Sequence, residues 1–546
     1  MAALDWRAIA AGKKARQVAS IPKEWLRKLS NIPTQNDISV TSYPSYCDLL
    51  SEKELNITNY QVDHLLHQLS RGELSAVEVT TAFCKRAVIA HQLTNCLTEI
   101  FIEQALVHAA TLDEHFKKTR KIVGLLHGLP ISLKDQVNVK GIESTMGYVS
   151  WVNKYAERNA VLVDILEAEG AVLYVKTNVP QTLMWAETFN HVFGRTYNPH
   201  NRSLTSGGSS GGEGALIALR GAAIGVGSDI GGQIHQNPFC VLWRLRLATV
   251  IWSILGPISN SIGGLKVFMK AVVDAQPWLK DPLAVRKRWS EKEYQLVEHG
   301  GGKKLCFAIL WDDGNIGPHP PITRGLEMTK TALVRAGHKV IDWVPLKHGE
   351  IYNCLHIIWG AGAYEDYETM TAPTGEPIIE SMNPELEGLV EGLSFRPSGG
   401  ISAYQLWQAQ KKRRDLREEY LQYWQNTITV TGTGRPVDAI ISPVAPCAAP
   451  PHGQNKHANY TMVWNGLDYT SLVIPVSNVD QRLDVKRPRK TFYNDTDKAI
   501  YESYDPATFK NAPIAIQVIG RTLEEEAVIA MAEIVDTALK TGIAKL

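Results

Sequence analysis

Apolar residues recur along this chain with two alternating periods, one typical of helices and one typical of strands. An S-x-x-E capping signal at Ser75 precedes apolar residues at helical spacing, which predicts a helix there. Further on, Ile131 and Leu133 alternate with Ser132 and Lys134, which predicts a strand with one apolar and one polar face. Helical and strand segments therefore follow one another early in the sequence.

The same alternation continues to the end of the chain. A helix that stops at Gly170 leads into an apolar strand over Ala171–Val175, a unit that builds parallel or mixed sheets. Further strands are predicted in 303–314, 338–346, 437–446 and 511–520, with a helix over Thr329–Ala336 and an amphipathic closing helix over 522–540. The predicted fold class is therefore α/β.

Length and composition are those of a globular protein. The chain has 546 residues, 44% of them apolar and 21% charged, with a formal charge of +1. This balance gives no reason to expect a nucleic-acid partner or a polybasic membrane contact. No apolar run reaches the ~20 residues of a membrane span, and the seven scattered cysteines are typical of reduced thiols. We therefore expect a cytoplasmic protein without a membrane span.

The alternation of helical and strand segments becomes regular only after the first 55 residues, which divides the chain into two regions. Residues 1–55 combine short helical stretches with polar connectors, so we expect an N-terminal helical arm packed against the main body. From about Ile57 onward the alternation is regular. Residues 56–546 are therefore expected to form the main domain.

Two glycine-rich loops, 207–212 and 227–232, are the most distinctive motifs of the chain. A phosphate-binding loop is excluded, because no G-K-[ST] follows and no G-x-G-x-x-G lies between a strand and a helix. Residues 207–211 match the G-x-S-x-G of a nucleophile elbow, but that elbow needs a strand running into the serine, and a polar loop precedes it here. The glycines could also form flexible turns, or the second loop could offer its backbone N–H groups as an oxyanion hole.

Several ordered motifs are shared with a known family. They include "ITNYQVDHLLHQLSRGELSAVEVTTAFCKRA", "GLPISLKDQVNVKG", "KTNVPQTLMWAE", "GGSSGGEGALIA", "YTMVWNGLDYTSLVIPV" and "APIAIQVIGRTLEEE". On these motifs the chain resembles the amidase signature family, and within it the fungal acetamidase-type amidases. The resemblance implies a large, mixed, twisted central sheet with helices on both faces. It also implies hydrolysis of a small or medium linear carboxamide without a metal or organic cofactor, and it leaves a homodimer open as the assembly.

The resemblance assigns a Lys–Ser–Ser relay to the site. Lys134 matches the family's lysine, and Ser209 matches its bridging serine, which follows a cis peptide bond after Gly208. The lysine must be neutral to act as a base, and burial beside hydroxyls rather than carboxylates would favour the neutral amine. Ser132, on the same strand face, is expected as a hydrogen-bond neighbour of the lysine, and Ser228 is expected to pack within its own loop.

The remaining assignments concern the substrate and the nucleophile. The resemblance implies that the backbone N–H groups of Ile230, Gly231, Gly232 and residue 233 form the oxyanion hole, and that Leu183 contacts the substrate. The family's nucleophilic serine is expected at the position that Gln233 occupies. A carboxamide does not attack a carbonyl to form an acyl-enzyme, and loss of such a serine costs on the order of 10⁶ in kcat.

Departures from the family pattern cluster in residues 233–254. His235 stands in place of an arginine, and Arg244 and Leu247 replace a glycine and a proline. Three interpretations follow: an amidase with lost or reduced activity, a non-catalytic amide-binding or scaffold protein, or an error in this stretch of the sequence. A fourth interpretation is an amidotransferase-type subunit, which passes ammonia to a partner.

Overall fold

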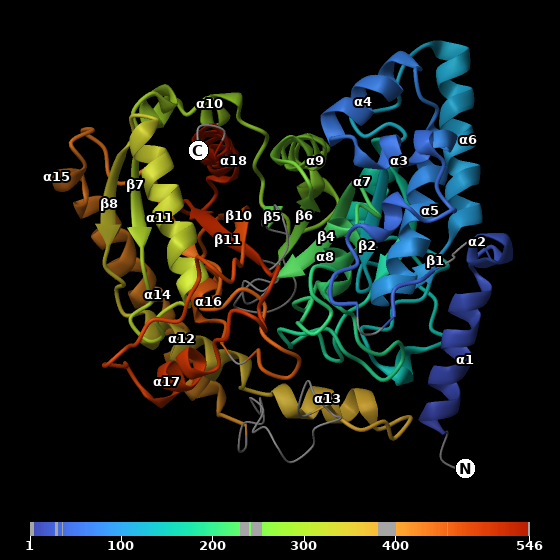
Figure 1. Ribbon diagram of the computed structural model, residues 1–546. Coiled ribbons are helices and arrows are strands. Elements are labelled where there is room, and N and C mark those ends of the chain that lie inside the picture. Colours follow the sequence, from blue (N-terminus) through green and yellow to red (C-terminus); the bar gives the residue numbers. More distant parts are fainter. Residues whose placement is uncertain are drawn as a thin grey trace.

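A large central sheet runs across the molecule (Figure 1). The computed structural model describes residues 5–27, 31–34, 37–229, 240–241, 254–379, 400–455 and 457–543. Within these ranges the strands join into a sheet of eleven. From one edge to the other they are β1 (Leu97–Ile100), β3 (Val172–Thr177), β2 (Pro130–Lys134), β4 (Ile224–Asp229), β6 (Ile254–Ser259), β5 (Cys240–Val241), β10 (Ser471–Asn478), β11 (Pro513–Ile519), β9 (Ala439–Pro443), β7 (Cys306–Leu310) and β8 (Lys339–Trp343).

The sheet combines parallel and antiparallel pairs. β2 is parallel to both β3 and β4, and β7 is parallel to both β8 and β9. The pairs that join these two parallel blocks, through β6, β5, β10 and β11, are antiparallel, as is the pair of β1 with β3. The large mixed sheet implied by the family resemblance is therefore confirmed.

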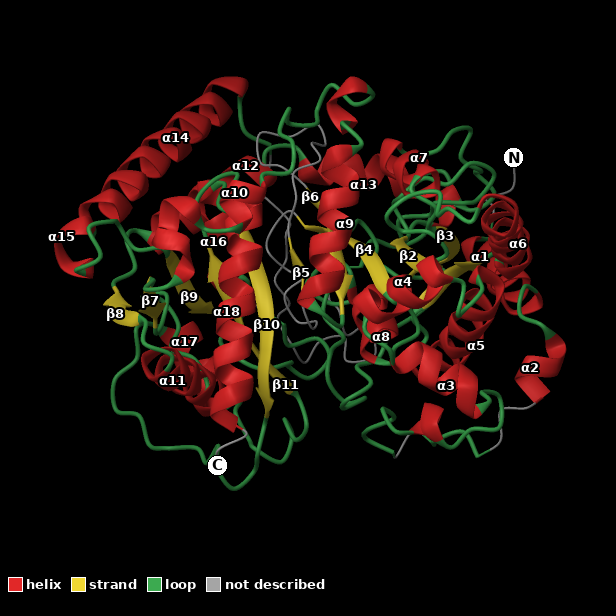
Figure 2. Ribbon diagram, turned by 90° about the horizontal axis from the view of Figure 1, so that it is seen from above, coloured by secondary structure: helices red, strands yellow, loops and turns green. Residues whose placement is uncertain are grey.

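Helices surround the sheet on both faces (Figure 2). The α-helices are α1 (Trp6–Ala19), α2 (Lys23–Arg27), α3 (Glu52–Asn59), α4 (Val62–Arg71), α5 (Ala76–Thr94), α6 (Ile102–Thr119), α7 (Val161–Ala168), α8 (Gly211–Ala218), α9 (Ile262–Asp274), α10 (Glu291–Tyr294), α11 (Pro320–Arg335), α12 (His348–Trp359), α13 (Ala363–Thr371), α14 (Ala403–Asn426), α15 (Ile428–Thr431), α16 (Asn459–Leu467), α17 (Asp495–Glu502) and α18 (Glu525–Ile543). Short 3₁₀ turns are η1 (Tyr43–Ser45), η2 (Val149–Trp151), η4 (Pro277–Leu279) and η5 (Val297–Gly302).

Strand β7 shows why helices are needed on both sides of the sheet. Phe307 and Ile309 pack into a core shared with α11 and α18, whereas Cys306, Ala308 and Leu310 pack into a second core shared with α12, α14 and α16. Figure 2 shows α12, α14 and α16 on one side of β7–β9 and α11 on the other. A strand that is apolar on both faces is stable only when both faces are covered.

Local signals in the sequence place several of these elements correctly. Ser75 caps α5, and its hydroxyl and the Glu78 carboxylate form the reciprocal hydrogen bonds of a capping box. Between α7 and β3, Gly170 has a φ of 82°, a left-handed conformation that glycine adopts without steric cost. All five residues of β2 are buried, so the polar face of this strand is as inaccessible as its apolar face.

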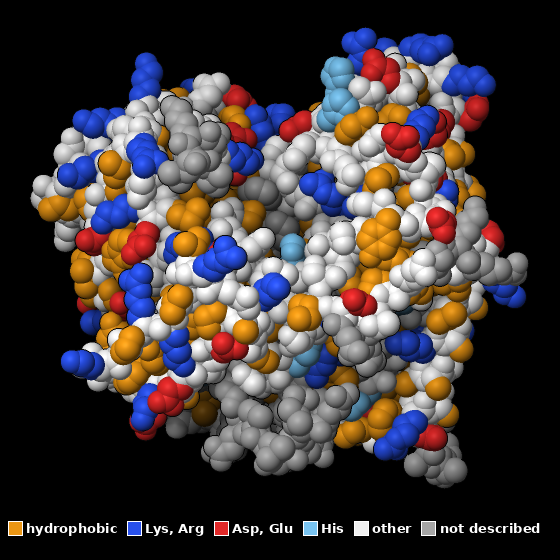
Figure 3. All heavy atoms as spheres, viewed as in Figure 1, with side chains coloured by type: hydrophobic (Ala, Val, Ile, Leu, Met, Phe, Trp, Pro, Cys, Tyr) orange, Lys and Arg blue, Asp and Glu red, His pale blue; other side chains and the backbone are white. Residues whose placement is uncertain are grey.

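The surface carries both signs of charge. On the face shown in Figure 3, the described Lys and Arg side chains are interspersed with Asp, Glu and hydrophobic side chains. In the part of the chain that the structure describes, no helix combines the length and the apolar content that crossing a bilayer requires.

The N-terminal helix α1 lies along the edge strand β1. Gln17 Nε2 donates to the backbone carbonyl of Leu97 at 2.6 Å. Lys13 is buried and pairs with Glu99 at 2.5 Å and with Glu143 at 3.1 Å. These contacts hold the first part of the expected arm against the main body. The boundary after residue 55 stays a prediction, and it falls inside α3.

We expect Lys13→Ala to release α1 from β1, because the carboxylates of Glu99 and Glu143 would lose a buried partner at a cost of about 3–5 kcal/mol. Backbone amides of α1 should then exchange hydrogen about 100-fold faster or more, measured by mass spectrometry. Arg16→Ala is the matched control, since the Arg16 side chain is 46% exposed and its pair with Glu143 contributes little. Equal protection of α1 in both variants would contradict this role of Lys13.

Candidate active site

Lys134, at the end of β2, is fully buried and has hydroxyl partners on two other segments. Its Nζ lies 2.6 Å from Ser209 Oγ and 2.7 Å from Ser228 Oγ, both within hydrogen-bond distance. A weaker contact of 3.4 Å joins Nζ to the carbonyl oxygen of Ser228. The structure therefore brings together two of the residues predicted for the site, Lys134 and Ser209.

Ser209 is placed by the first glycine-rich loop, which runs directly into α8. The peptide bond between Gly208 and Ser209 is cis, as the family resemblance implies. Residues 185–188 lie directly against this loop: a Cβ atom on Gly208 would come within 2.5 Å of the Trp185 carbonyl oxygen. Thr188 Oγ1 donates to the carbonyl of Gly207 at 2.8 Å. Glycine is needed at position 208 because the neighbouring backbone occupies the space of a side chain.

Ser228 contacts the lysine directly, whereas the sequence analysis expected it to pack within its own loop. It lies in β4, which is parallel to β2 and in register with it, so the ends of the two strands meet at the same edge of the sheet. Its hydroxyl donates to Gln136 Oε1 at 2.8 Å. Ser210 Oγ donates to the carbonyl of Ser228 and accepts from its N–H, each at 3.2 Å. These bonds tie the start of α8 to the end of β4.

The sequence reasoning missed Ser228, although its glycine-rich context was noticed. The strand-like run before Ser228 could have revealed its role only if that strand had been predicted to pair with the strand of Lys134. Residues 227–229, which were expected in the second loop (227–232), belong to β4 instead.

Burial dominates the electrostatics of Lys134 and lowers its pKa to about 7. The charges of Asp229, Glu213 and Asp135 act in the opposite direction. The expectation of hydroxyls rather than carboxylates is therefore wrong in part: hydroxyls make the contacts, and carboxylates lie nearby. Desolvation still outweighs these charges, so a neutral amine is accessible near neutral pH.

The expected hydrogen bond between Lys134 and Ser132 is replaced by another pair. Ser132 Oγ donates to Glu213 Oε2 at 2.6 Å. Residues two apart on a strand share a face but are separated by two residue rises, about 6.6 Å. Glu213, which enters from α8, lies close enough to take the Ser132 hydroxyl.

The substrate-side predictions are only partly covered by the structure. Leu183 lies in the loop after β3, with a φ of 63°, and its N–H donates to the carbonyl of Pro180 at 3.2 Å. A few residues on, this loop forms the contacts with Gly208 described above. Ile230, Gly231, Gly232 and Gln233 lie outside the described residues. The assignments of an oxyanion hole and of a substrate contact for Leu183 stay predictions.

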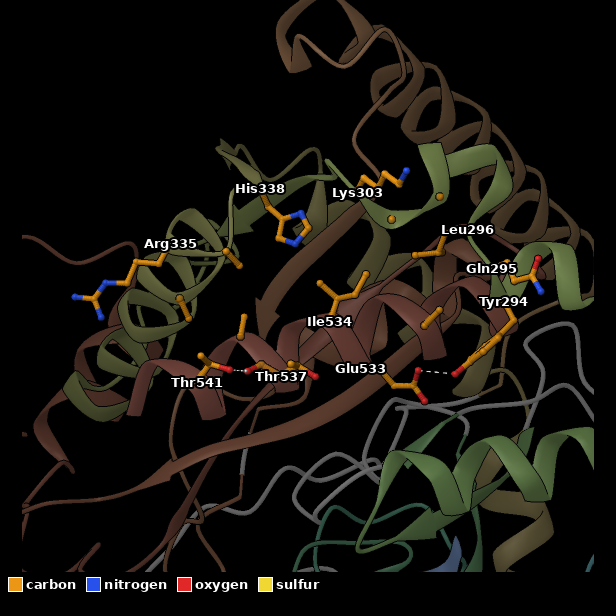
Figure 4. Close-up of a pocket in the computed structure, with 16 residues that line it drawn as sticks. Tyr294, Gln295, Leu296, Lys303, Arg335, His338, Glu533, Ile534, Thr537 and Thr541 are labelled. Atoms are coloured by element: carbon orange, nitrogen blue, oxygen red, sulfur yellow. Dashed lines mark hydrogen bonds between the residues drawn. The ribbon is translucent and has the colours of Figure 1, made fainter. Parts of the chain in front are cut away.

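A separate cavity of about 660 Å³ lies in the other half of the molecule (Figure 4). It is lined by residues of α11, α18 and the segment 294–303, and by His338 in the turn between α11 and β8. At one side of it, the Tyr294 hydroxyl donates to Glu533 at 2.6 Å. Of the predicted site residues that the structure describes, none lines this cavity.

Comparisons with known proteins show the family to which the chain belongs. The family model for amidases matches residues 78–236 and 245–529. Acetamidases of Emericella nidulans and Aspergillus oryzae are each 41% identical to the chain, over 97% and 99% of its length and over 97% and 100% of their own.

Solved structures show the same fold. A fatty acid amide hydrolase superposes with a TM-score of 0.87 at 30% identity, covering 97% of this chain and 95% of that one. A 6-aminohexanoate cyclic dimer hydrolase, at 17% identity and a TM-score of 0.68, covers 89% of this chain and 98% of its own. With a family match over most of its length and relatives that cover nearly all of it, the chain belongs to the amidase family of amide hydrolases.

Proposed function

We propose that the protein hydrolyses small or medium linear carboxamides to a carboxylate and ammonia or an amine, with Lys134 as the base and Ser209 as the proton relay. The observation that carries this proposal is the 2.6 Å contact between Lys134 Nζ and Ser209 Oγ in a fully buried setting. Two relatives named acetamidase, each 41% identical, support a small amide as the substrate.

In this mechanism the neutral amine accepts a proton from the Ser209 hydroxyl, which in turn accepts one from a nucleophilic hydroxyl at residue 233. That hydroxyl attacks the amide carbonyl, and the backbone N–H groups of residues 230–233 stabilise the oxyanion. The proton then passes along the relay to the leaving nitrogen, which departs as ammonia or an amine. A water molecule, deprotonated along the same relay, then cleaves the acyl-enzyme ester to release the carboxylate and restore the hydroxyl. Gln233 supplies no such hydroxyl, so the relay has no nucleophile at its outer end. We therefore propose that turnover is strongly reduced by this residue.

A second candidate function, amide binding without turnover, is favoured by Gln233 itself. An error in residues 233–254 is the other way to account for it. The family match breaks between residues 236 and 245, inside this stretch. A sequenced transcript that encodes a serine at position 233 would show that the stretch is an error and would support an ordinary amidase.

An amidotransferase-type subunit is a third candidate, and ammonia transfer to an ATP-dependent partner would distinguish it.

Three broader proposals accompany the function. Residues 56–546 act as one catalytic domain with residues 1–55 as an arm. The protein works in the cytoplasm, which the six cysteines with described side chains support, since all are free thiols. A homodimer is the proposed assembly.

We expect Gln233→Ser to raise kcat for acetamide, butyramide or hexanamide by orders of magnitude, up to about 10⁶-fold, because it supplies the missing nucleophile. Ammonia release measures the rate, and a fluorophosphonate adduct at residue 233 reports an activated hydroxyl. The double variant with Lys134→Met is the matched control and should lose both signals. If Gln233→Ser binds these amides without releasing ammonia, the binding function is favoured instead.

The pH profile of Gln233→Ser should report the base. Because Lys134 acts in its neutral form and burial lowers its pKa to about 7, kcat/KM should rise about tenfold per pH unit below neutrality and level off above it. Initial rates between about pH 5 and 9 test this. A rate that falls as the pH rises through neutrality would rule out an unprotonated amine as the base.

A further inference from the structure

Glu213, in the first turn of α8, is a fully buried carboxyl outside the relay. Its Oε2 accepts the hydroxyl of Ser132 at 2.6 Å, and its Oε1 accepts the hydroxyl of Thr177 at 3.0 Å. Among the described residues, no cationic group lies within 4.0 Å of this carboxyl. Two hydroxyl donors and no ion pair are unusual surroundings for a buried carboxyl, which normally pairs with a cation.

The sheet leaves a space for this carboxyl. A Cβ atom on Gly225 of β4 would lie 1.9 Å from Glu213 Oε2 and 2.9 Å from Ser132 Oγ. In the register of β2 and β4, Gly225 pairs with Ser132. The carboxyl therefore occupies the place that a side chain on β4 would fill, over three neighbouring strands.

The same strands surround Lys134. Ser132 is two residues before the lysine on the same face of β2. Thr177 is the residue of β3 that pairs with Lys134 in the register of the two strands. Glu213 thus bonds to the lysine's own strand and to the strand beside it. α8 also begins two residues after Ser209, so one short segment carries both the relay hydroxyl and this carboxyl.

We propose that Glu213 is a positioning residue for catalysis: its buried carboxyl, seated over three strands beside Lys134, holds the amine basic enough to take a proton from Ser209. The inference rests on the proposed role of Lys134 as the base. Burial pushes both groups toward their neutral forms, whereas their mutual attraction favours the ammonium and the carboxylate. Without that attraction, the lysine would be a weaker base than the reaction needs.

Other charges also face the lysine, and they have different surroundings. Asp135, the next residue along, accepts from Thr98 Oγ1 at 2.7 Å and from the N–H of Met146 at 2.7 Å. Asp229 lies at the end of β4, and its charge is the strongest of those opposing the burial of Lys134. Glu213 differs from both because a strand glycine makes room for it.

The test replaces Glu213 by glutamine, which keeps the shape and removes the charge. Protein carrying [ε-¹³C]lysine is titrated by NMR, and the Lys134 signal is assigned by its loss in Lys134→Met. We expect the midpoint of Lys134 in Glu213→Gln to fall by up to about one pH unit. Burial raises the pKa of Glu213 to about 8, so only part of this carboxyl is ionised where Lys134 titrates. Glu376→Gln is the matched control, a buried carboxyl bound instead to the N–H groups of Val149 and Ser150. It should leave the midpoint unchanged.

A Lys134 midpoint that stays within error of the unmodified protein, or rises, would overturn the proposal. If Glu213→Gln does not fold, Thr177→Val removes one hydroxyl donor to the carboxyl and should lower the midpoint in the same direction by less. An unchanged midpoint there would overturn the proposal equally. The titration needs no turnover, so failure of the proposed hydrolysis would be recognised separately in the ammonia assay.

Discussion

The proposed mechanism depends on one constraint, the burial of an amine that must nevertheless accept a proton. Lys134 meets this constraint because its contacts are hydroxyls: Ser209 and Ser228 hydrogen-bond to the amine without requiring it to be charged. A carboxylate in direct contact would hold the lysine as the ammonium ion, which has no free electron pair to accept a proton. The charges of Asp229, Glu213 and Asp135 act on the lysine in addition to these hydroxyl contacts, and they moderate the effect of burial without cancelling it.

The rest of the local structure serves to bring those hydroxyls to the lysine. Three parallel strands, β3, β2 and β4, place Lys134 and Ser228 at one edge of the sheet. The start of α8 supplies Ser209, and the loop after β3 lies so close to it that glycine is required at position 208. The glycines of the first glycine-rich loop, 207–212, therefore form neither a phosphate-binding loop nor simply flexible turns. They allow close approach of backbone to backbone.

The sequence predicted features that depend on neighbouring residues, and it failed where distant segments meet. The alternation around Ile131 and Lys134 indicated the strand and its faces, and Ser75 marked the start of α5. The contact between Ser132 and Glu213 was not predictable from alternation, because it depends on how α8 crosses the strands. The role of Ser228 likewise depends on β2 lying between β3 and β4, an order that differs from the order along the chain. The family resemblance supplied the pairing of Lys134 with Ser209, which local patterns alone did not contain.

The burial of Lys134 and Glu213 does not stabilise the fold, so it calls for a chemical explanation. A buried lysine and a buried carboxyl usually cost more free energy than apolar residues of similar volume. Here Lys134 and Glu213 are both fully buried. The Glu213 carboxyl occupies the space that a side chain at position 225 would need, so a glycine stands there. A scaffold that only had to fold would gain by filling this region with apolar side chains. These costs support the proposal that Lys134 serves proton transfer, in which Gln233 occupies the sequence position of the nucleophile. Under that proposal, the unusual element of the sequence is the nucleophile position alone.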